Sequence, residues 1–405
     1  MRCVLACLLL VIAVGLPSQA IHLVGPGGLP QIRDALAIAA PGDVIHVQPG
    51  TYAHFEANVG VTIRVLTPGT VTVTYDPAFM PPGCSLSLNC LLAQGPTHLQ
   101  PPAGQTLHVV GVDFAPEFSS SGAPRHRVVV NGGRVTFDQC SFRSGHSVPL
   151  SIANATVHMQ DCEASCQAFV YGGSPAPGVA ATNSDVTAVD CLFYGTMSAP
   201  IGAGQFPHEG LWLQSSRLHG SGLLITGGSV AFPGSSLLGS PALSLDGPCP
   251  VWLSDSTIIA GPSECAIEGA TATTRVDRCT ITSNATGCGT GVTTPFLLGV
   301  DRSGPLSPGA VFTLNYRTEP NGFVLIFAGG ELGTVDFGPF LEQPSWLGEN
   351  TSFVAGLVVA DATGLATASW PIPTGPFADL TLWFKGISGF TLPLQASAPA
   401  GGVVR

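Results

Sequence analysis

One short pattern recurs eight times without gaps through the middle of the chain, and it constrains the fold more than any other feature. In each copy the first, third and eighth positions are mostly apolar, and the sixth is Cys, Ser or Val. Successive copies begin 19 to 29 residues apart, on average about 24. A period of roughly 20 to 50 residues is typical of architectures in which each unit stacks on the next. The copies begin at Leu107, Val135, Val157, Val186, Leu211, Val230, Val251 and Thr274.

Each repeat unit is expected to consist of short strands. Apolar residues alternate with other residues inside each copy, which is typical of a strand with one face directed inward. A second short strand precedes six of the copies, for example Val128–Asn131 before Val135. Too few turn residues separate equivalent strands of consecutive copies to let them form hairpins. We therefore expect each coil to stack on the next in parallel. The pattern predicts a parallel β-helix of roughly ten coils, about 50 Å long at ~4.8 Å per coil.

Polar residues at the ends of these strands are interpreted as turn residues. Asparagine ends the second strand of successive coils, and aspartate stands just before the sixth position of three copies. Both residue types tolerate the left-handed backbone that a tight corner needs. We therefore expect structural rather than chemical roles for them. These residues are Asn131, Asn154, Asn183, Asp161, Asp190 and Asp255.

The residues before the repeats resemble the opening of a known fold family. The run Ile32–Tyr52 contains Gly42-Asp43, the apolar stretch Val44–Val47 and then Pro49–Tyr52. This order is similar to the start of right-handed β-helix proteins of the pectin-lyase-like superfamily, and the similarity extends over about residues 22 to 285. The resemblance implies a right-handed parallel β-helix over residues 21–286, with an N-terminal capping helix. The face of that helix expected to cover the open core comprises Ile32, Ala35, Leu36 and Ala39.

A different all-β unit is expected after the repeats. Residues 287–296 are a linker by composition, and from about Phe296 the repeat pattern is replaced by alternating strands between Gly and Pro turns. Six or seven antiparallel strands in about 110 residues suit a β-sandwich. Residues 297–405 are therefore assigned to a small antiparallel β-sandwich. This part resembles the C-terminal modules of large secreted bacterial proteins.

The charge balance and the N-terminus limit the partners and the compartment. The formal net charge is −11, and Lys385 is the single lysine, so a nucleic-acid-binding protein that contacts phosphates is excluded. Residues 1–20 have the pattern of a signal peptide, with Arg2, the apolar run Val4–Leu16 and a cleavage site after Ala20. No later stretch reads as a membrane span. We expect a secreted or cell-surface protein.

Ten cysteines remain once residues 1–20 are removed, and an even number in an oxidising compartment predicts disulfides. Proximity in the sequence suggests three local bridges. The cysteine spacings lack the two pairs of a zinc site, so no metal or other cofactor is predicted. The pairing of Cys140, Cys162, Cys166 and Cys191 stays open. The expected pairs are Cys84 with Cys90, Cys249 with Cys265, and Cys279 with Cys288.

The pectin-lyase-like resemblance implies a polysaccharide lyase, a glycoside hydrolase or an epimerase. A lyase needs a strong base, usually Arg or Lys, together with acidic groups or Ca²⁺. The predicted β-helix contains no lysine, and the Asn-x-Asp, paired aspartate, Gly-His and Arg-x-Lys features of pectin-degrading hydrolases do not occur in order. We therefore expect a non-catalytic structural or carbohydrate-binding protein. A divergent polysaccharide-active enzyme is the alternative.

The repeat pattern also predicts which side chains point outward. The second position of each copy places Trp212 and Trp252 in one column, two coils or roughly 10 Å apart. Flat indoles at this spacing suit consecutive sugar rings, so a polysaccharide or a cell-surface glycan is the expected partner. The alternative is that the C-terminal sandwich or a long loop covers both indoles. The polar residues expected beside them are Gln214, Gln160, Arg275 and Asp277.

Two weak catalytic candidates accompany this face. His158 and Asp138 lie on adjacent coils, where they could act as a base and its orienting partner. His208 and Glu209 lie on an insertion over residues 195–210 and could reach over the face as an acid/base pair.

Overall fold

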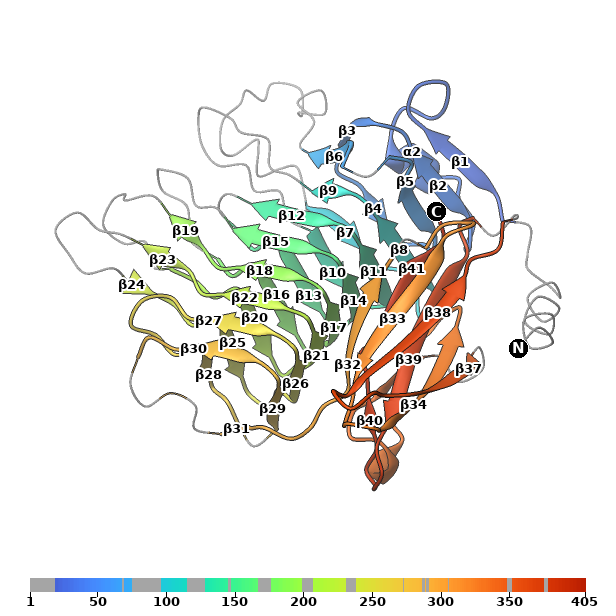
Figure 1. The fold of residues 1–405 in the computed structure, drawn as a ribbon. Helices are drawn as coiled ribbons and strands as arrows, with labels where there is room; N and C mark the ends of the chain where they lie inside the picture. Colours follow the sequence, from blue (N-terminus) through green and yellow to red (C-terminus); the bar gives the residue numbers. More distant parts are fainter. Residues whose placement is uncertain are drawn as a thin grey trace.

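The computed structural model describes residues 19–67, 69–74, 96–114, 128–144, 147–166, 176–198, 207–230, 238–271, 273–285, 288, 291–304, 306–347, 352–374 and 378–405. Residues 1–18 of the expected signal peptide, and Cys84 and Cys90, lie outside this part. The chain folds as a right-handed parallel β-helix followed by an antiparallel, sandwich-like C-terminal region (Figure 1).

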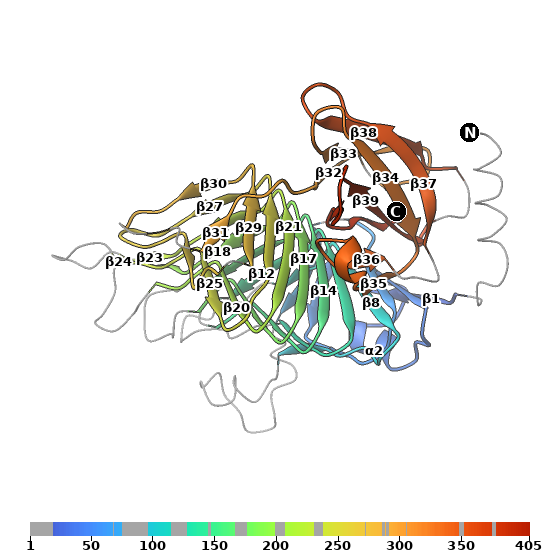
Figure 2. The same ribbon diagram turned by 90° about the horizontal axis from the view of Figure 1, so that it is seen from below.

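Three parallel sheets form the β-helix, and each coil contributes strands to them in turn (Figures 1 and 2). Sheet A contains β1 (Ile21–Val24), β2 (Val44–Val47), β5 (Thr62–Val65), β8 (Thr106–Val110), β11 (Arg134–Asp138), β14 (Thr156–Gln160), β17 (Asp185–Val189), β21 (Arg217–Ser221), β26 (Val251–Ser254), β29 (Thr274–Asp277) and β31 (Val292–Thr293). Sheet B contains β3 (Gly50–Ala53), β6 (Val71–Thr74), β9 (Asp113–Phe114), β12 (Ser141–Ser144), β15 (Glu163–Cys166), β18 (Leu192–Tyr194), β22 (Leu224–Thr226), β27 (Thr257–Ile259) and β30 (Thr280–Thr282). Sheet C contains β4 (Glu56–Ala57), β7 (Thr97–Leu99), β10 (Val128–Asn131), β13 (Leu150–Ala153), β16 (Val179–Thr182), β20 (Leu211–Gln214), β25 (Leu243–Asp246) and β28 (Ile267–Glu268). A small sheet contains β19 (Met197–Ser198), β23 (Ser229–Val230) and β24 (Leu238–Gly239).

The alternation in the sequence builds the core of the β-helix. Val109, Phe137, Met159 and Ala188 occupy the same register position on four consecutive strands of sheet A, and all four are fully buried. Stacking of equivalent residues therefore gives one continuous apolar core from Val24 to Val276. β31, inside the stretch expected to be a linker, pairs with β29 and extends sheet A.

The corners between sheets confirm the interpretation of the polar residues. Asp161, Asp190 and Asp255 follow strands of sheet A with φ of 50°, 53° and 51°. Asn154 and Asn183 follow strands of sheet C with φ of 51° and 47°. At the corner after Asn131 the positive φ falls on Gly132 instead. These five aspartates and asparagines thus adopt the left-handed conformation at the first of the two residues that separate consecutive strands.

The N-terminal helix is shorter than expected. Helix α2 (Ile32–Leu36) is a single turn, so the extended amphipathic helix reaching Ala39 is not found. Ile32, Ala35 and Leu36 are buried in the core of the β-helix. The chain turns at Pro41-Gly42, with Gly42 at φ 90°, and this leaves little length for further helical turns.

The named strands of the C-terminal region, here called the sandwich, all pair in antiparallel fashion among the described residues. Its core includes Phe312, Trp370 and Phe384, whose ring centroids lie 4.7 to 6.5 Å apart. One sheet contains β32 (Gly299–Ser303), β33 (Val311–Arg317) and β38 (Leu365–Pro371). The other contains β37 (Ser352–Val359), β34 (Phe323–Gly329), β39 (Thr381–Ser388), β40 (Gln395–Ala396) and β41 (Ala400–Val403). The hairpin β35 (Leu332–Val335) and β36 (Ser345–Leu347) and the 3-10 helix η2 (Gly338–Phe340) complete it.

The disulfide pairing predicted for residues 249–288 is wrong. Cys265 bonds to Cys288, with Cα atoms 5.4 Å apart, whereas Cys249 and Cys279 are free. The separation of 23 residues is close to the length of one coil, so the bridge joins equivalent edges of consecutive coils. The four cysteines left open by the sequence, Cys140, Cys162, Cys166 and Cys191, are free and buried.

We expect Cys288→Ser to lower the free energy of unfolding by about 3 kcal/mol, because the bridge closes a loop of intermediate length. Urea unfolding without reductant measures this loss. Cys279→Ser, which removes a free thiol from the same end of the β-helix, is the control and should cost less. Peptide mapping that finds Cys279 joined to Cys288 would contradict the pairing.

Candidate functional site

The outward face of sheet A carries most of the site residues expected from the sequence. Register pairing places His158, Trp252 and Arg275 in one column, and Asp138 and Gln160 in the neighbouring one. Asp277 extends that second column. From β8 to β29 the first column is His108, Thr136, His158, Thr187, His219, Trp252 and Arg275.

This face is covered by the sandwich, which lies beside sheet A in both ribbon views (Figures 1 and 2). His158 is 1% exposed, Gln160 0%, Asp138 3% and Trp252 9%. Val189 of β17, although it points out of the β-helix, belongs to the apolar core of the sandwich. The expected glycan-binding face on sheet A is therefore an interface between the two parts of the chain, and the alternative of a covering sandwich is correct for Trp252.

The two indoles do not share a column, so that prediction is wrong. Trp212 lies on β20 in sheet C between Ala180 and Ser244, whereas Trp252 lies on β26 in sheet A next to His219. Trp212 was assigned to sheet A because the corners after sheet A and after sheet C look alike in the sequence. Each places a left-handed residue before a small buried one. Ser215 has φ of 47° and precedes the buried Ser216, like Asp255 before Ser256. Val230 likewise lies on β23, outside the three main sheets.

Histidines beneath the sandwich are neutral and form a ladder with threonines. His108 Nδ1 lies 2.7 Å from Thr136 Oγ1, and His158 Nδ1 lies 2.7 Å from Thr187 Oγ1. The ring of Trp383 packs edge-on against His158, with centroids 4.6 Å apart. Burial lowers the pKa of His158 to about 3 and that of His108 to about 4. The expected pairing of His158 with Asp138 is not found among the described residues, because Asp138 pairs with Arg302 and Arg405 instead and both side chains are buried beneath the sandwich.

Asp138 instead anchors the end of the chain. Its carboxylate accepts from Arg405 Nη2 at 3.0 Å and pairs with Arg302 Nη2 at 3.4 Å. Arg302 also pairs with Asp161 and donates to the carbonyl of Gly401 at 2.7 Å. These side chains line a cleft of about 270 Å³ between the corner of the β-helix and the sandwich. Burial raises the pKa of Asp138 although both arginines oppose the rise.

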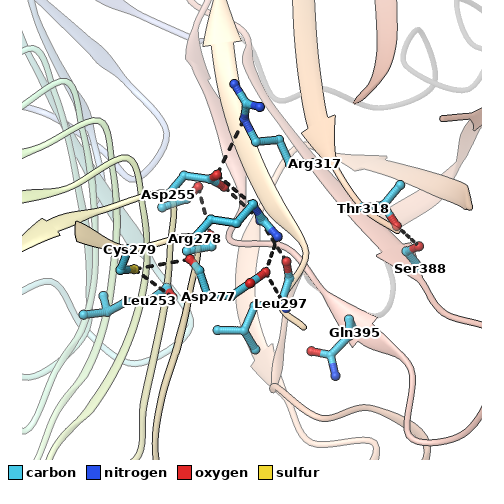
Figure 3. A network of polar contacts seen from close by, with 12 residues as sticks. Leu253, Asp255, Asp277, Arg278, Cys279, Leu297, Arg317, Thr318, Ser388 and Gln395 are labelled. Carbon is cyan, nitrogen blue, oxygen red and sulfur yellow. Dashed lines mark hydrogen bonds and ion pairs between the residues drawn. The ribbon is translucent and has the colours of Figure 1, made fainter. Parts of the chain in front are cut away.

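A second polar network, shown in Figure 3, holds the start of the sandwich. Arg278 donates to both oxygens of Asp255 at 2.8 and 2.9 Å and to the carbonyl of Leu297 at 3.0 Å. Asp277 accepts from the backbone N–H of Leu297 at 3.0 Å and pairs with Arg278. Arg317 of β33 approaches Asp255 at 3.6 Å. Asp277 thus holds the two parts of the chain together.

Two further residues show how polar this interface is. Arg275, expected to bind a glycan, forms an ion pair with Glu342 of the sandwich. Lys385 is 1% exposed, donates to the carbonyl of Pro344 at 3.0 Å, and has a pKa lowered well below its usual range by burial. The sequence analysis missed Trp383, Arg302 and Arg405. A covering domain was nevertheless indicated in the sequence by Val110 and Val189, which are apolar although they occupy outward positions of the repeat.

Sheet C remains as the candidate functional face. The interdomain hydrogen bonds and ion pairs described above all involve sheet A or its corners, and Trp212, Ser244 and Gln214 on sheet C are partly exposed. Ala180 and Ser244 flank Trp212 on the neighbouring strands. Because both side chains are small, the indole stands above the surface on either side of it. Gln214 Nε2 donates to Asp246 Oδ2 at 2.8 Å. On this face the indole of Trp212 therefore lies beside the polar pair of Gln214 and Asp246, because Gln214 follows Trp212 by two residues on β20.

His208 and Glu209 lie at the corner that leads into β20. His208 Nδ1 lies 3.3 Å from Glu209 Oε2, so the expected pair is in contact. The carbonyl of Glu209 accepts from Gly178 N at 3.2 Å and that of His208 from Gly228 N at 2.9 Å, which fixes the backbone of both residues. They precede Trp212 by only a few residues and belong to the sheet C side of the β-helix.

The described part of the chain lacks two kinds of feature. There is no cluster of three or more His, Cys, Asp or Glu side chains placed to hold a metal ion. No helix found there is long and apolar enough to cross a membrane.

Comparisons with known proteins reveal only distant similarity. No protein-family model and no curated protein matches the chain. ORF18 of Geobacillus virus E2 is 10% identical, with a TM-score of 0.37 over 84% of this chain and 72% of that one. The enzymatically active domain of tailspike protein 2 from bacteriophage CBA120 is 11% identical, with a TM-score of 0.25 over 94% and 71%. A tailspike protein double mutant of E. coli bacteriophage HK620 is 8% identical, with a TM-score of 0.22 over 91% and 92%. Values this low assign neither activity nor ligand.

Proposed function

We propose that the protein is a secreted or cell-surface β-helix that binds a polysaccharide or cell-surface glycan on sheet C and does not act as an enzyme. The main support is the position of Trp212. It lies partly exposed on sheet C, whose outer face takes no part in the contacts between the β-helix and the sandwich described above. The sandwich and sheet A then form the rigid body that carries this face.

The chemistry of the Trp212 face suits a neutral sugar. An indole packs its flat apolar surface against the C–H face of a sugar ring. Ala180 and Ser244 on the neighbouring strands leave room for rings on either side of the indole. The amide of Gln214 and the carboxylate of Asp246 offer a donor and acceptors for sugar hydroxyls. Together they supply the few fixed polar groups that orient a ligand on an apolar platform.

Location outside the cell is part of the proposal. Residues 1–20 have the pattern of a signal peptide. The Cys265–Cys288 disulfide also suits an oxidising compartment.

We expect Trp212→Ala to abolish binding on a glycan array, with at least a tenfold loss of affinity for any glycan that the unmodified protein binds. Stability should change little, because Trp212 is partly exposed. Tyr194→Ala, which removes a partly exposed aromatic side chain from sheet B, is the matched control and should bind normally. Equal losses in both variants, or no glycan binding by the unmodified protein, would count against the proposal and leave a structural protein.

A divergent polysaccharide lyase, glycoside hydrolase or epimerase is the alternative, and the contact between His208 and Glu209 favours it. A histidine held by a carboxylate can act as a general base. Product analysis on a bound glycan distinguishes the two functions. New reducing or unsaturated ends that disappear in Glu209→Gln would establish catalysis at this pair.

A further inference from the structure

The sandwich exposes a strip of large apolar side chains along its outermost strand. β37 is the end strand of its sheet and, among the described residues, pairs with β34 alone. The exposed fractions are 54% for Val354, 63% for Leu357 and 68% for Val359. Exposed apolar side chains concentrated on one surface mark an interaction site more often than single ones do.

These side chains are contiguous. Val359 lies opposite Phe323 on β34, Leu357 opposite Leu325, and, after a bulge, Val354 opposite Phe327. The bulge keeps all three β37 residues on one face of the sheet. The ring of Phe390, 64% exposed, packs edge-on against Phe323 at 5.9 Å between centroids. We call this surface the β37 strip; it comprises Phe323, Val354, Leu357, Val359, Phe390 and Leu392.

The β37 strip continues an interface that already exists. On β39 the same face presents Lys385 opposite Phe327 and Ile387 opposite Leu325. Lys385 is buried, and Trp383 on the same face of β39 packs against His158 of the β-helix. On this sheet face the side chains are thus buried at Trp383 and Lys385 of β39 and exposed at β37.

The charges at the ends of β34 and β37 argue against an anionic lipid surface as the occupant. Glu319 lies just before β34 and Asp361 just after β37, and the carbonyl of Asp361 accepts from the N–H of Asn321 between them. With a formal net charge of −11, the chain as a whole would also be repelled by anionic lipids. An anionic lipid surface is therefore not the expected occupant.

We propose that a second copy of this chain pairs with this one through β37, antiparallel about a twofold axis, so that the β37 strips of the two protomers lie side by side on one continuous sheet. An edge strand offers a row of unpaired N–H and C=O groups, and pairing with an identical strand satisfies both copies at once. A twofold contact of this kind uses the same patch on both protomers and leaves no free edge.

Sedimentation equilibrium of the mature chain, residues 21–405, tests the proposal. We expect twice the monomer mass at micromolar concentration. Val359→Lys should place two like charges in the apolar contact and raise the dissociation constant at least a hundredfold. Val311→Lys is the matched control, because Val311 is 56% exposed but lies on the other sheet of the sandwich. That variant should dimerise like the unmodified protein, and far-ultraviolet circular dichroism confirms that both variants are folded.

Three results would overturn the proposal. The unmodified protein could be a monomer up to about 100 µM. It could form an oligomer that survives Val359→Lys, or it could form a species other than a dimer. Co-flotation with neutral phosphatidylcholine vesicles that Val359→Lys abolishes would assign the β37 strip to a lipid surface instead.

Discussion

Replacing Arg302 by alanine should lower the free energy of unfolding by about 3 to 5 kcal/mol and loosen the sandwich from the β-helix. The side chain of Arg302 is 7% exposed and pairs with Asp138 and Asp161, while its Nη1 donates to the carbonyl of Gly401. The side chain of Asp138 is 5% exposed. Removing one partner of a buried ion pair destabilises a fold by about this amount, and among the described residues Arg405 is then the one cation still paired with Asp138.

Urea unfolding measures the loss, and Arg143→Ala is the matched control. Arg143 pairs with Asp113 on the surface of the β-helix and its side chain is 44% exposed, so its removal should cost at most about 1 kcal/mol. Because Arg302 bridges the two parts of the chain, its loss should also separate unfolding into two transitions. Equal stability of the two variants would show that the Arg302 contacts do not hold the sandwich in place.

The β-helix could be predicted from the sequence because the signal is local. Inward alternation places Phe137, Met159 and Ala188 in register, and one left-handed residue such as Asp161 or Asp190 is enough for a corner. The same local signal could not tell β20 from a strand of sheet A. Leu211–Gln214 has the same alternation, and its corner at Ser215 has the same geometry as the others.

What covers each sheet depends on contacts between residues far apart in the sequence. Trp383 lies 225 positions after His158, and no periodicity in the repeat refers to it. Val110 and Val189, which are apolar and yet point outward, were the only trace of a covering domain within the repeat, and they mark where sheet A is buried. The disulfide was more accessible to sequence reasoning, because a spacing close to one coil brings Cys265 and Cys288 together, whereas proximity in the sequence does not.

Acidification should destabilise the interface beneath the sandwich. Burial lowers the pKa of His158 and His219 to about 3 and that of His108 to about 4, against 6.5 for an unburied histidine. Arg302 near His158 and Lys385 near His219 disfavour protonation further. Since the folded pKa values are lower, the unfolded chain binds protons first. Stability should therefore be lost as the pH falls from about 6.5 toward 4, at about 1.4 kcal/mol per pH unit for each group.

Carboxyl groups with raised pKa values oppose this loss in part. Burial, with Asp301 and Asp161 nearby, raises the pKa of Asp190 to about 7, so the folded state takes up that proton first as the pH falls. The raised pKa of Asp138 acts in the same sense. Three histidines outweigh these groups, and we expect a net loss of a few kcal/mol between pH 6.5 and pH 4.5.

Urea unfolding at pH 7 and pH 5 measures the effect, and His219→Gln isolates one contributor. His219 Nδ1 has no hydrogen-bond partner among the described residues, so the substitution should change the free energy of unfolding little at pH 7. It should also lower by about one the number of protons taken up on unfolding in acid. An unchanged midpoint between pH 7 and pH 5 would mean that these histidines remain hydrated, and the sandwich would then not seal sheet A from water.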